Sequence, residues 1–309
     1  MPSLLIGASG FVGLRLAAEL RERGQHVAAM VRDPEASTAG RLEEMGCELR
    51  RADLTDSASL EPALEDVDVV YYLAHLMSAD GGDLVGDETR AARAVGTAAA
   101  RAGTTQVVYL GGLGDPDASE HLRARHATAL ALGETGPPLT YFRAAMVVGH
   151  GSGSYELLRA LVERLPAMIS PEWLENRTQP IGVRDVIEYL ADAPGVEGAR
   201  GREIQLGGPE VMTYSQMLEG MARALGKKVP WRLPTPVGIS AEAVGNVAGA
   251  VTRGDPQIAE HLTAGLDTDT VVEDRSGMEL FDIEPETYAL ALARAIEDEA
   301  QAADAVASE

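Results

Sequence analysis

Three glycines at regular spacing follow a short apolar run close to the start of the chain. The run is Leu4–Ile6, and Gly7, Gly10 and Gly13 come directly after it. Glycine at the first two positions permits a tight turn and lets backbone amides approach a phosphate, and the third glycine lets a helix pack closely on a strand. The pattern indicates a phosphate-binding loop, although a glycine-rich turn that binds nothing has the same spacing.

A helix is expected directly after this loop. Apolar residues recur at helical period from Phe11 to Leu20, and Gly24 marks the end of the segment. The N-terminus of such a helix offers unpaired N–H groups and the positive end of its dipole to an anion. We therefore expect the loop and the helix to hold the pyrophosphate of a dinucleotide together.

Arg32 stands at the end of the second predicted strand, residues 25–31. In a dinucleotide-binding fold, this position contacts the adenosine ribose. An acidic residue there suits a free 2′-hydroxyl, whereas the planar guanidinium of Arg32 can pair with a 2′-phosphate. Since Asp33 comes one place later, we favour NADP(H) over NAD(H), with a solvated Arg-Asp turn as the structural alternative.

The third predicted strand, residues 47–54, ends at Asp53 and Leu54. These two residues are candidates for contact with the adenine. Asp53 suits a turn at Thr55–Asp56 or the cap of a helix from Ser57 equally well, because aspartate favours such positions for local reasons.

Six predicted strands alternate with helices through the first half of the chain. They cover residues 3–6, 25–31, 47–54, 68–75, 106–112 and 139–148. Most are short apolar runs without polar alternation, which is typical of strands buried on both faces of a parallel sheet. The pattern predicts an α/β fold with a doubly wound parallel sheet in Rossmann order. The fourth strand ends at Ala74 and His75, at the sheet edge where ligands bind in such folds.

Beyond Gly149 the alternation becomes less regular. We therefore divide the chain into an NAD(P)-binding Rossmann core, residues 1–150, and a smaller, mostly helical C-terminal region, residues 151–309. That region is expected to contribute partly to the core sheet and partly to a cap on the substrate side. The tail from residue 284 is rich in Ala, Asp and Glu, and we expect a helix that frays into solvent.

Residues 237–251 are apolar, with small residues spaced four apart. The run is too short for a membrane span and carries Glu242, so it indicates a packed core helix or a dimer contact. A homodimer is therefore possible. No continuous apolar stretch of about 18 residues occurs, which argues against a membrane span.

The charge balance is strongly acidic, with 26 basic and 48 acidic residues and a net charge of −22. In dilute salt this charge repels itself, whereas in molar salt the Debye length of about 3 Å screens the repulsion. We interpret the surface as halophilic; an ordinary acidic cytosolic protein is the alternative. Either interpretation argues against nucleic acid and anionic membranes as partners.

The single cysteine, Cys47, the lack of zinc-type clusters and the lack of a signal peptide indicate a reducing, cytoplasmic setting and no metal site.

Together, these motifs resemble an atypical extended short-chain dehydrogenase/reductase, of the NAD(P)H-binding group that includes NmrA-like regulators and an accessory subunit of respiratory complex I. The stretches 109–114, 121–125, 157–166 and 177–186 strengthen the resemblance, which covers most of residues 3–208. The residues that the resemblance assigns to the cofactor are Gly7, Gly10, Gly13, Arg32, Asp53, Leu54 and Ala74. Further candidates for cofactor contact are Ser9, Phe11, Val12 and His75, and a purely structural role is the alternative for His75.

The chain departs from the family at the catalytic positions. The resemblance implies a serine after the fifth strand and Tyr-x-x-x-Lys on the next helix. Here the fifth strand ends in Gly111–Gly112, and the helix carries His121-x-x-x-Arg125. Arg125 can hold a ribose but stays protonated, whereas a histidine near its ordinary pKa of about 6.5 is able to act as an acid. His121 is therefore a candidate proton donor, or a helix-start histidine without chemistry.

Arg177 and Gln179 lie in a polar loop of the C-terminal region and are candidate substrate contacts or turn-stabilising residues. The function favoured by the sequence is an NADPH-dependent reductase or dehydrogenase of a small carbonyl compound or enone. The alternative is a non-catalytic NADP(H)-binding redox sensor or assembly subunit with a protein partner. A nucleotide-sugar epimerase is disfavoured, because the resemblance implies that its chemistry needs the missing Tyr/Lys pair.

Overall fold

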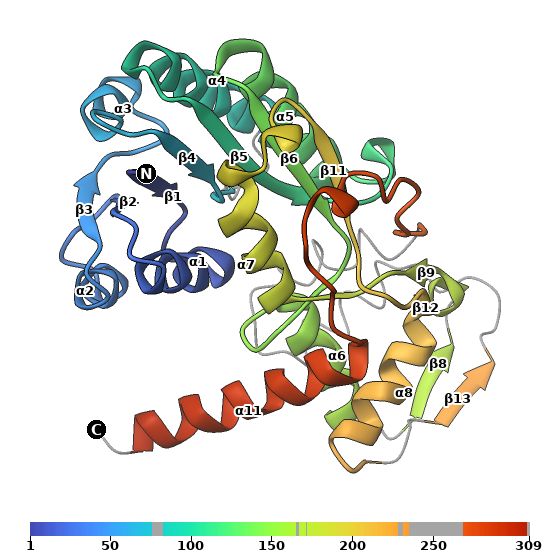
Figure 1. Cartoon of the computed structure of the whole chain (residues 1–309). Coiled ribbons are helices and arrows are strands. Elements are labelled where there is room, and N and C mark those ends of the chain that lie inside the picture. The colour runs from blue at the N-terminus through green and yellow to red at the C-terminus, as the bar shows by residue number, and fades with distance from the viewer. Residues whose placement is uncertain (76–82, 165–166, 171, 228–230, 235–267, 308–309) are drawn as a thin grey trace.

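The computed structural model describes residues 1–75, 83–164, 167–170, 172–227, 231–234 and 268–307 (Figure 1). The apolar run 237–251 lies outside these residues. No helix in the described ranges is long and apolar enough to cross a bilayer.

Seven parallel strands form one sheet within the described residues, in the order β3-β2-β1-β4-β5-β6-β11. The strands are β1 (Ser3–Ile6), β2 (Val27–Val31), β3 (Glu48–Arg51), β4 (Val69–Tyr72), β5 (Gln106–Gly112), β6 (Leu139–Ala144) and β11 (Glu203–Leu206). The order reverses between β1 and β4, which makes that junction the topological switch point where such sheets bind ligands. The predicted doubly wound Rossmann sheet is confirmed.

Helices cover both faces of the sheet (Figure 1). One layer holds α1 (Phe11–Glu22), α2 (Ser37–Glu44) and α7 (Val183–Asp192), and the other holds α3 (Ser57–Ala63), α4 (Leu84–Ala102) and α5 (Glu120–Thr135). Successive strand residues serve opposite faces: Leu5 packs in the first layer, whereas Leu4 and Ile6 pack in the second. Both layers are needed because every residue of β1 is buried.

The predicted strand 139–148 is two strands. β6 ends at Ala144, and β7 (Val147–Val148) pairs with β10 (Ile181–Gly182) in a separate two-stranded sheet. The neighbours of β6 also end here, β5 at Gly112 and β11 at Leu206, so the chain has no further partner in the main sheet. The prediction of one long strand was wrong for that reason.

The C-terminal region packs three helices around a third core: α6 (Gly153–Arg164), α8 (Tyr214–Ala224) and α11 (Tyr288–Ala307). Two further strand pairs are β8 (Ala167–Ser170) with β13 (Trp231–Pro234) and β9 (Arg177–Thr178) with β12 (Met212–Thr213). Short 3-10 turns are η1 (Pro116–Ala118), η2 (Glu172–Glu175), η3 (Ala193–Gly195), η4 (Glu197–Ala199) and η5 (Met278–Leu280).

The tail helix α11 is anchored through its first half. Tyr288 and Leu292 are buried in the third core, and the Tyr288 hydroxyl donates to the carbonyl of Met217 at 2.9 Å. Asp298 accepts a hydrogen bond from Arg184 at 3.0 Å. The expected helix is present, but the expectation that it frays into solvent was wrong for this half, because apolar residues at helical spacing give it a face to bury.

Candidate functional site

Two of the three loop glycines are required by the packing of the protein itself. Gly7 has a φ of +86°, and a Cβ on it would lie 2.6 Å from the backbone nitrogen of Ala74. A Cβ on Gly13 would overlap the carbonyl oxygen of Gly7. The loop is therefore pressed against the end of β4 on one side and against the first turn of α1 on the other.

Gly10 has no such constraint. It has the ordinary φ of −79°, and a Cβ there would meet Gly7 O alone, at 3.3 Å. Gly10 is also the N-cap of α1 and has no side chain to satisfy the first N–H groups of the helix. An anion at this position would find open space and unpaired donors, so the loop fits the pyrophosphate of a dinucleotide.

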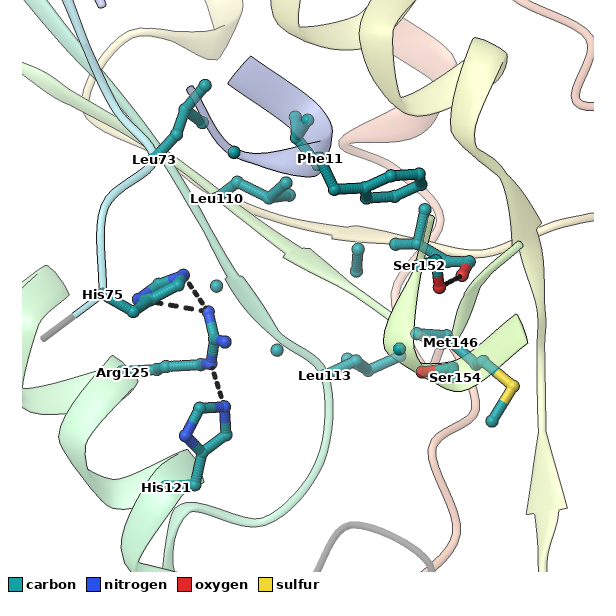
Figure 2. Close-up of a pocket in the computed structure, with 18 of the residues that line it drawn as sticks. Phe11, Leu73, His75, Leu110, Leu113, His121, Arg125, Met146, Ser152 and Ser154 are labelled. Carbon is teal, nitrogen blue, oxygen red and sulfur yellow. Dashed lines mark hydrogen bonds between the residues drawn. The ribbon is translucent and has the colours of Figure 1, made fainter. Parts of the chain in front are cut away.

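A cavity of about 490 Å³ opens at this loop and runs along the carboxyl ends of the strands (Figure 2). Gly7, Gly10 and Phe11 line one end, and Arg125 lines the other. The volume lies within the roughly 300–1,000 Å³ that ligand pockets occupy. The predicted phosphate loop and the predicted catalytic helix therefore share one cavity.

Arg125 lies between two histidines (Figure 2). Its Nη1 contacts Nε2 of His75, which follows β4, and its Nε donates to Nε2 of His121, one turn earlier on α5, at 2.6 Å. Arginine has no acceptor, so each histidine presents a nitrogen without a hydrogen to the guanidinium. The arrangement brings together three residues that the sequence singled out separately.

The neutral state of His75 follows from its surroundings. Burial lowers the pKa of His75 to about 4, and the charge of Arg125 adds to this effect. The buried carboxylate of Glu88, 3.8 Å from Nδ1 of His75, opposes the shift only in part. At neutral pH, the formal positive charge of the His75–Arg125 contact is therefore carried by Arg125.

Neighbouring side chains pack closely against the two glycines at the serine position. A Cβ on Gly112 would lie 2.9 Å from Cδ2 of Leu122, and a Cβ on Gly111 would lie 2.8 Å from the ring of Tyr141. Side chains from α5 and β6 thus occupy the space that a serine would need. At the end of β5, Gly111 and Gly112 therefore line the cavity without a side chain.

The structure brings most of the loop and helix candidates to the cavity. Those that line it are Gly7, Gly10, Phe11, Val12, Gly13, His75, His121 and Arg125. Arg32 is exposed at the end of β2, close enough to Asp53 for its charge to be felt there. Contact of Ser9, Arg32, Asp53, Leu54 and Ala74 with a cofactor stays a prediction.

Asp53 forms the turn that was its alternative role. Its carboxylate accepts from the backbone N–H and the hydroxyl of Thr55, at 2.8 and 2.7 Å, and these bonds hold the pKa of Asp53 below its ordinary value. The neighbouring helix α3 is capped by Asp56 instead, which accepts from Ala58 N at 3.1 Å. A local role for Asp53 is present whether or not it contacts adenine.

The side-chain contacts of Arg177 and Gln179 are structural, and neither residue lines the cavity, although the backbone of each hydrogen-bonds to Thr270, which does. Arg177 forms an ion pair with Asp269 at 2.7 Å. Gln179 is buried, donates to Gly208 O at 2.6 Å and accepts from Val272 N at 3.1 Å. These contacts support the turn-stabilising alternative, and a substrate contact stays a prediction for either residue.

Sequence reasoning missed the far wall of the cavity, which comes from the C-terminal region. Ser152, Ser154, Tyr214 and Thr270 supply its polar part. They lie far apart in the chain and share no motif, so only the fold brings them together. Glu88 was also missed, although its position on the apolar stripe of α4, four residues after buried Leu84, was a readable signal.

The N-terminal part of the chain is similar in sequence to known proteins. Residues 7–137 match a family described as NAD(P)H-binding. Cinnamoyl-CoA reductase 1 of Oryza sativa subsp. japonica is 35% identical over 134 residues, 42% of this chain and 38% of that protein. Sterol demethylase protein B of Methylococcus capsulatus is 34% identical over 119 residues, 37% of this chain and 35% of that protein. The matched segments thus span little more than a third of each relative.

Similar solved structures extend over nearly the whole chain. The NADPH-dependent quinone oxidoreductase QOR2 of Escherichia coli, complexed with NADPH, has a TM-score of 0.73 at 20% identity and covers 95% of this chain and 99% of its own. The Citrobacter sp. triphenylmethane reductase, complexed with NADP(H), has a TM-score of 0.72 at 20% identity, with 95% and 99% covered. At this identity the likeness concerns the fold.

These comparisons define the class of protein: the chain contains an NAD(P)H-binding domain on a Rossmann sheet. More particularly, the similar solved structures include, besides the two proteins complexed with NADPH or NADP(H), a UDP-glucose 4-epimerase of Thermotoga maritima with a TM-score of 0.72 at 16% identity, with 98% of this chain and 99% of that chain covered. The resemblance predicted from the sequence is confirmed at this level.

Proposed function

We propose that the protein is an NADPH-dependent reductase of a small carbonyl compound or enone, with Arg125 acting on the substrate oxygen. The observation that carries the proposal is the shared cavity: the glycine loop opens at one end, and Arg125, held by His75 and His121, lies at the other. A nicotinamide cofactor bound at the loop would supply the hydride. NADP(H) is preferred in this proposal because Arg32 follows β2.

The chain's own residues divide the remaining work. The first turn of α1 and Gly10 hold the pyrophosphate, because open backbone donors face it there. Arg125 stabilises the negative charge that arrives on the substrate oxygen with the hydride. A guanidinium stays protonated, so it stabilises this charge without giving up its proton.

The proton needs a separate source. Nε2 of His121 is occupied by the hydrogen bond from Arg125, so a proton from His121 itself would have to leave Nδ1. Water held near His121 is the other source. An acceptor whose reduced anion is delocalised, such as an enone, depends more on charge stabilisation than on an immediate proton.

The lining of the cavity supports an apolar substrate. Its apolar lining includes Leu110, Leu113, Leu122 and Met146. The names of three similar proteins point the same way, since they are reductases or oxidoreductases of cinnamoyl-CoA, a quinone and triphenylmethane. Each of the three names contains an unsaturated ring: the phenyl group of cinnamoyl, the quinone ring and the phenyl rings of triphenylmethane.

A second candidate is a redox sensor that binds NADP(H) without turnover. Gly111–Gly112 has no serine hydroxyl, and the Nε2 of His121 is engaged by Arg125. Both features leave the cavity without the usual acid of catalytic relatives. An epimerase is less favoured than either, since its chemistry relies on the missing Tyr/Lys pair.

The proposal is tested by following NADPH oxidation at 340 nm in molar KCl with cinnamaldehyde and menadione as acceptors. We expect turnover by the wild type and a loss of about 100-fold in kcat/KM for Arg125→Ala, because one oxyanion-stabilising donor is worth roughly that much. Arg123→Ala is the matched control, since Arg123 is an exposed arginine on the same helix. Tight NADPH binding without oxidation by either acceptor would favour the sensor.

A further inference from the structure

We propose that Glu88 is a positioning residue for Arg125 and acts on it through His75. This inference rests on the proposed function, because it assigns Glu88 to the group that meets the substrate oxygen. The carboxylate lies outside the cavity lining, on α4, and belongs to no motif of the sequence. It anchors a series Thr128–Glu88–His75–Arg125 that runs from the buried contact of α4 with α5 to the cavity.

Glu88 is a buried charge with two placed oxygens. Its side chain is about 5% exposed, at the contact between α4 and α5. The Thr128 hydroxyl donates to Oε2 at 3.1 Å, and Oε1 lies 3.8 Å from Nδ1 of His75. A buried carboxylate is costly unless it is hydrogen-bonded and paired, so this placement needs the positive charge behind His75.

The direction of the hydrogen bonds fixes the state of His75. Arg125 donates to Nε2, so that nitrogen carries no hydrogen, and the neutral ring must carry its hydrogen on Nδ1. Nδ1 lies 3.8 Å from Oε1 of Glu88 and 3.3 Å from Nη1 of Arg125, and Nε2 is the ring nitrogen closer to Nη1. The carboxylate therefore selects the tautomer that leaves Nε2 able to accept from Arg125.

The neutral ring also separates the two charges. A carboxylate in direct contact with Arg125 would take up its donors and cancel much of its field in the cavity. With His75 between them, Glu88 balances the charge of Arg125 while Nη2 has no hydrogen-bond partner among the described residues. That nitrogen is the one left to face a substrate oxygen.

The other titratable groups around Glu88 do not change this charge balance. Tyr72 on β4 and Tyr109 on β5 face it, and burial raises the pKa of both phenols, so both stay neutral. Burial also acts to raise the pKa of Glu88, but the contacts with His75, Arg125 and Thr128 outweigh it and lower that pKa. The carboxylate stays ionised.

The test compares Glu88→Gln with Asp87→Asn, an exposed neighbour on α4 that pairs with Arg90. The ring of His75 is read by long-range ¹H–¹⁵N correlation and assigned with His75→Asn. We expect the single Nδ1–H tautomer in the wild type and in Asp87→Asn, and a mixture of tautomers in Glu88→Gln. We also expect kcat with menadione to fall about 10- to 100-fold in Glu88→Gln at unchanged KM for NADPH, the range that misplacing a reacting group costs.

Unchanged tautomer and unchanged kcat in a folded Glu88→Gln protein would overturn the inference. Circular dichroism shows whether Glu88→Gln is folded. If it is not, Thr128→Val serves as the milder variant, since it removes only the 3.1 Å hydrogen bond to Glu88. The two proposals remain separable: if no acceptor is reduced, the proposed function fails, whereas the tautomer of His75 still decides the role of Glu88.

Discussion

Nε of Arg125 donates to Nε2 of His121 at 2.6 Å, across one turn of α5. In this pair, the histidine gives its lone pair to the cation. Protonation of His121 at Nε2 would remove the bond and bring two positive charges into contact. The geometry therefore favours Arg125 as the group that acts on the substrate and His121 as a residue that holds it.

In the glycine loop, a substitution at Gly10 is expected to weaken cofactor binding with little effect on stability. Gly10→Ala should weaken NADPH binding at least tenfold, because the added methyl group occupies the approach to α1. It should change the free energy of unfolding by about 1 kcal/mol or less, since a Cβ there meets Gly7 O at an allowable 3.3 Å and only the cap changes. Binding is measured by fluorescence titration, and stability by urea unfolding.

Gly13→Ala is the matched control for that variant. Its Cβ would overlap Gly7 O, so we expect a destabilisation of about 1–3 kcal/mol by overpacking, whatever happens to the cofactor. Equal effects of the two substitutions on stability and on affinity would contradict the assignment of Gly10 to the ligand.

Arg32 is expected to set the cofactor preference. It is exposed at the end of β2, and its guanidinium can pair with a 2′-phosphate. Arg32→Ala should raise the Kd for NADPH by about 10- to 100-fold, the value of a hydrogen bond to a charged group, and leave the Kd for NADH within about twofold. Equal losses for the two cofactors would remove the 2′-phosphate assignment.

Asp185 predicts a pH dependence of stability. Burial raises the pKa of Asp185 to about 6. The hydrogen bond that its carboxylate accepts from the backbone N–H of Glu286, at 3.1 Å, opposes this shift only in part. Between pH about 4 and 6, the folded state therefore binds more protons than the unfolded state, and this group's contribution to stability is lost as the pH rises. Asp185→Asn should remove that loss.

The measurement for Asp185 is the free energy of unfolding of the wild type and of Asp185→Asn from pH 4 to 7. The difference should move in favour of the variant by about 2 kcal/mol across this range. Comparison of variants is needed because His75, with its pKa lowered to about 4, has the opposite sign and gains stability as the pH rises. A difference that does not change with pH would contradict the prediction.

The acidic composition predicts a dependence on salt. With a net charge of −22, the folded chain repels itself in dilute buffer, and molar salt screens this repulsion. We expect Tm to rise by 10 °C or more, on the order of a few kcal/mol for a domain of this size, between 50 mM and about 2 M KCl. The same Tm in both buffers, measured by differential scanning fluorimetry, would remove the halophilic interpretation.

Much of the fold could be predicted because its signals are local. Apolar runs such as Val69–Tyr72 are buried on both faces, so each run predicts a strand without knowledge of its neighbours. The break between β6 and β7 could not be read in the same way. Residues 139–148 are continuous in pattern, and the break arises because β5 and β11 end beside Ala144.

The candidate site could be predicted from the sequence only in part, for a similar reason. Gly7 follows a predicted strand and His75 ends one, while His121 and Arg125 lie in the first turns of a predicted helix. Topology alone therefore places these residues near one edge of the sheet. The contact of His75 with Arg125 depends on how α5 lies against β4, which no local pattern gives. The sequence pattern of α4 indicates that Glu88 is buried, but its contact with Thr128 depends on the packing of α4 against α5.

The central claim is that NADPH in this cavity gives up a hydride to an acceptor beside Arg125. The most direct measurement mixes enzyme and [4-²H]NADPH, deuterated on either face of C4, with cinnamaldehyde in molar KCl and follows single-turnover oxidation at 340 nm. The account predicts oxidation with a primary isotope effect from one face only, label in the reduced product, and a slower rate in Arg125→Ala. Saturated binding of NADPH with no transfer of label from either face would contradict it.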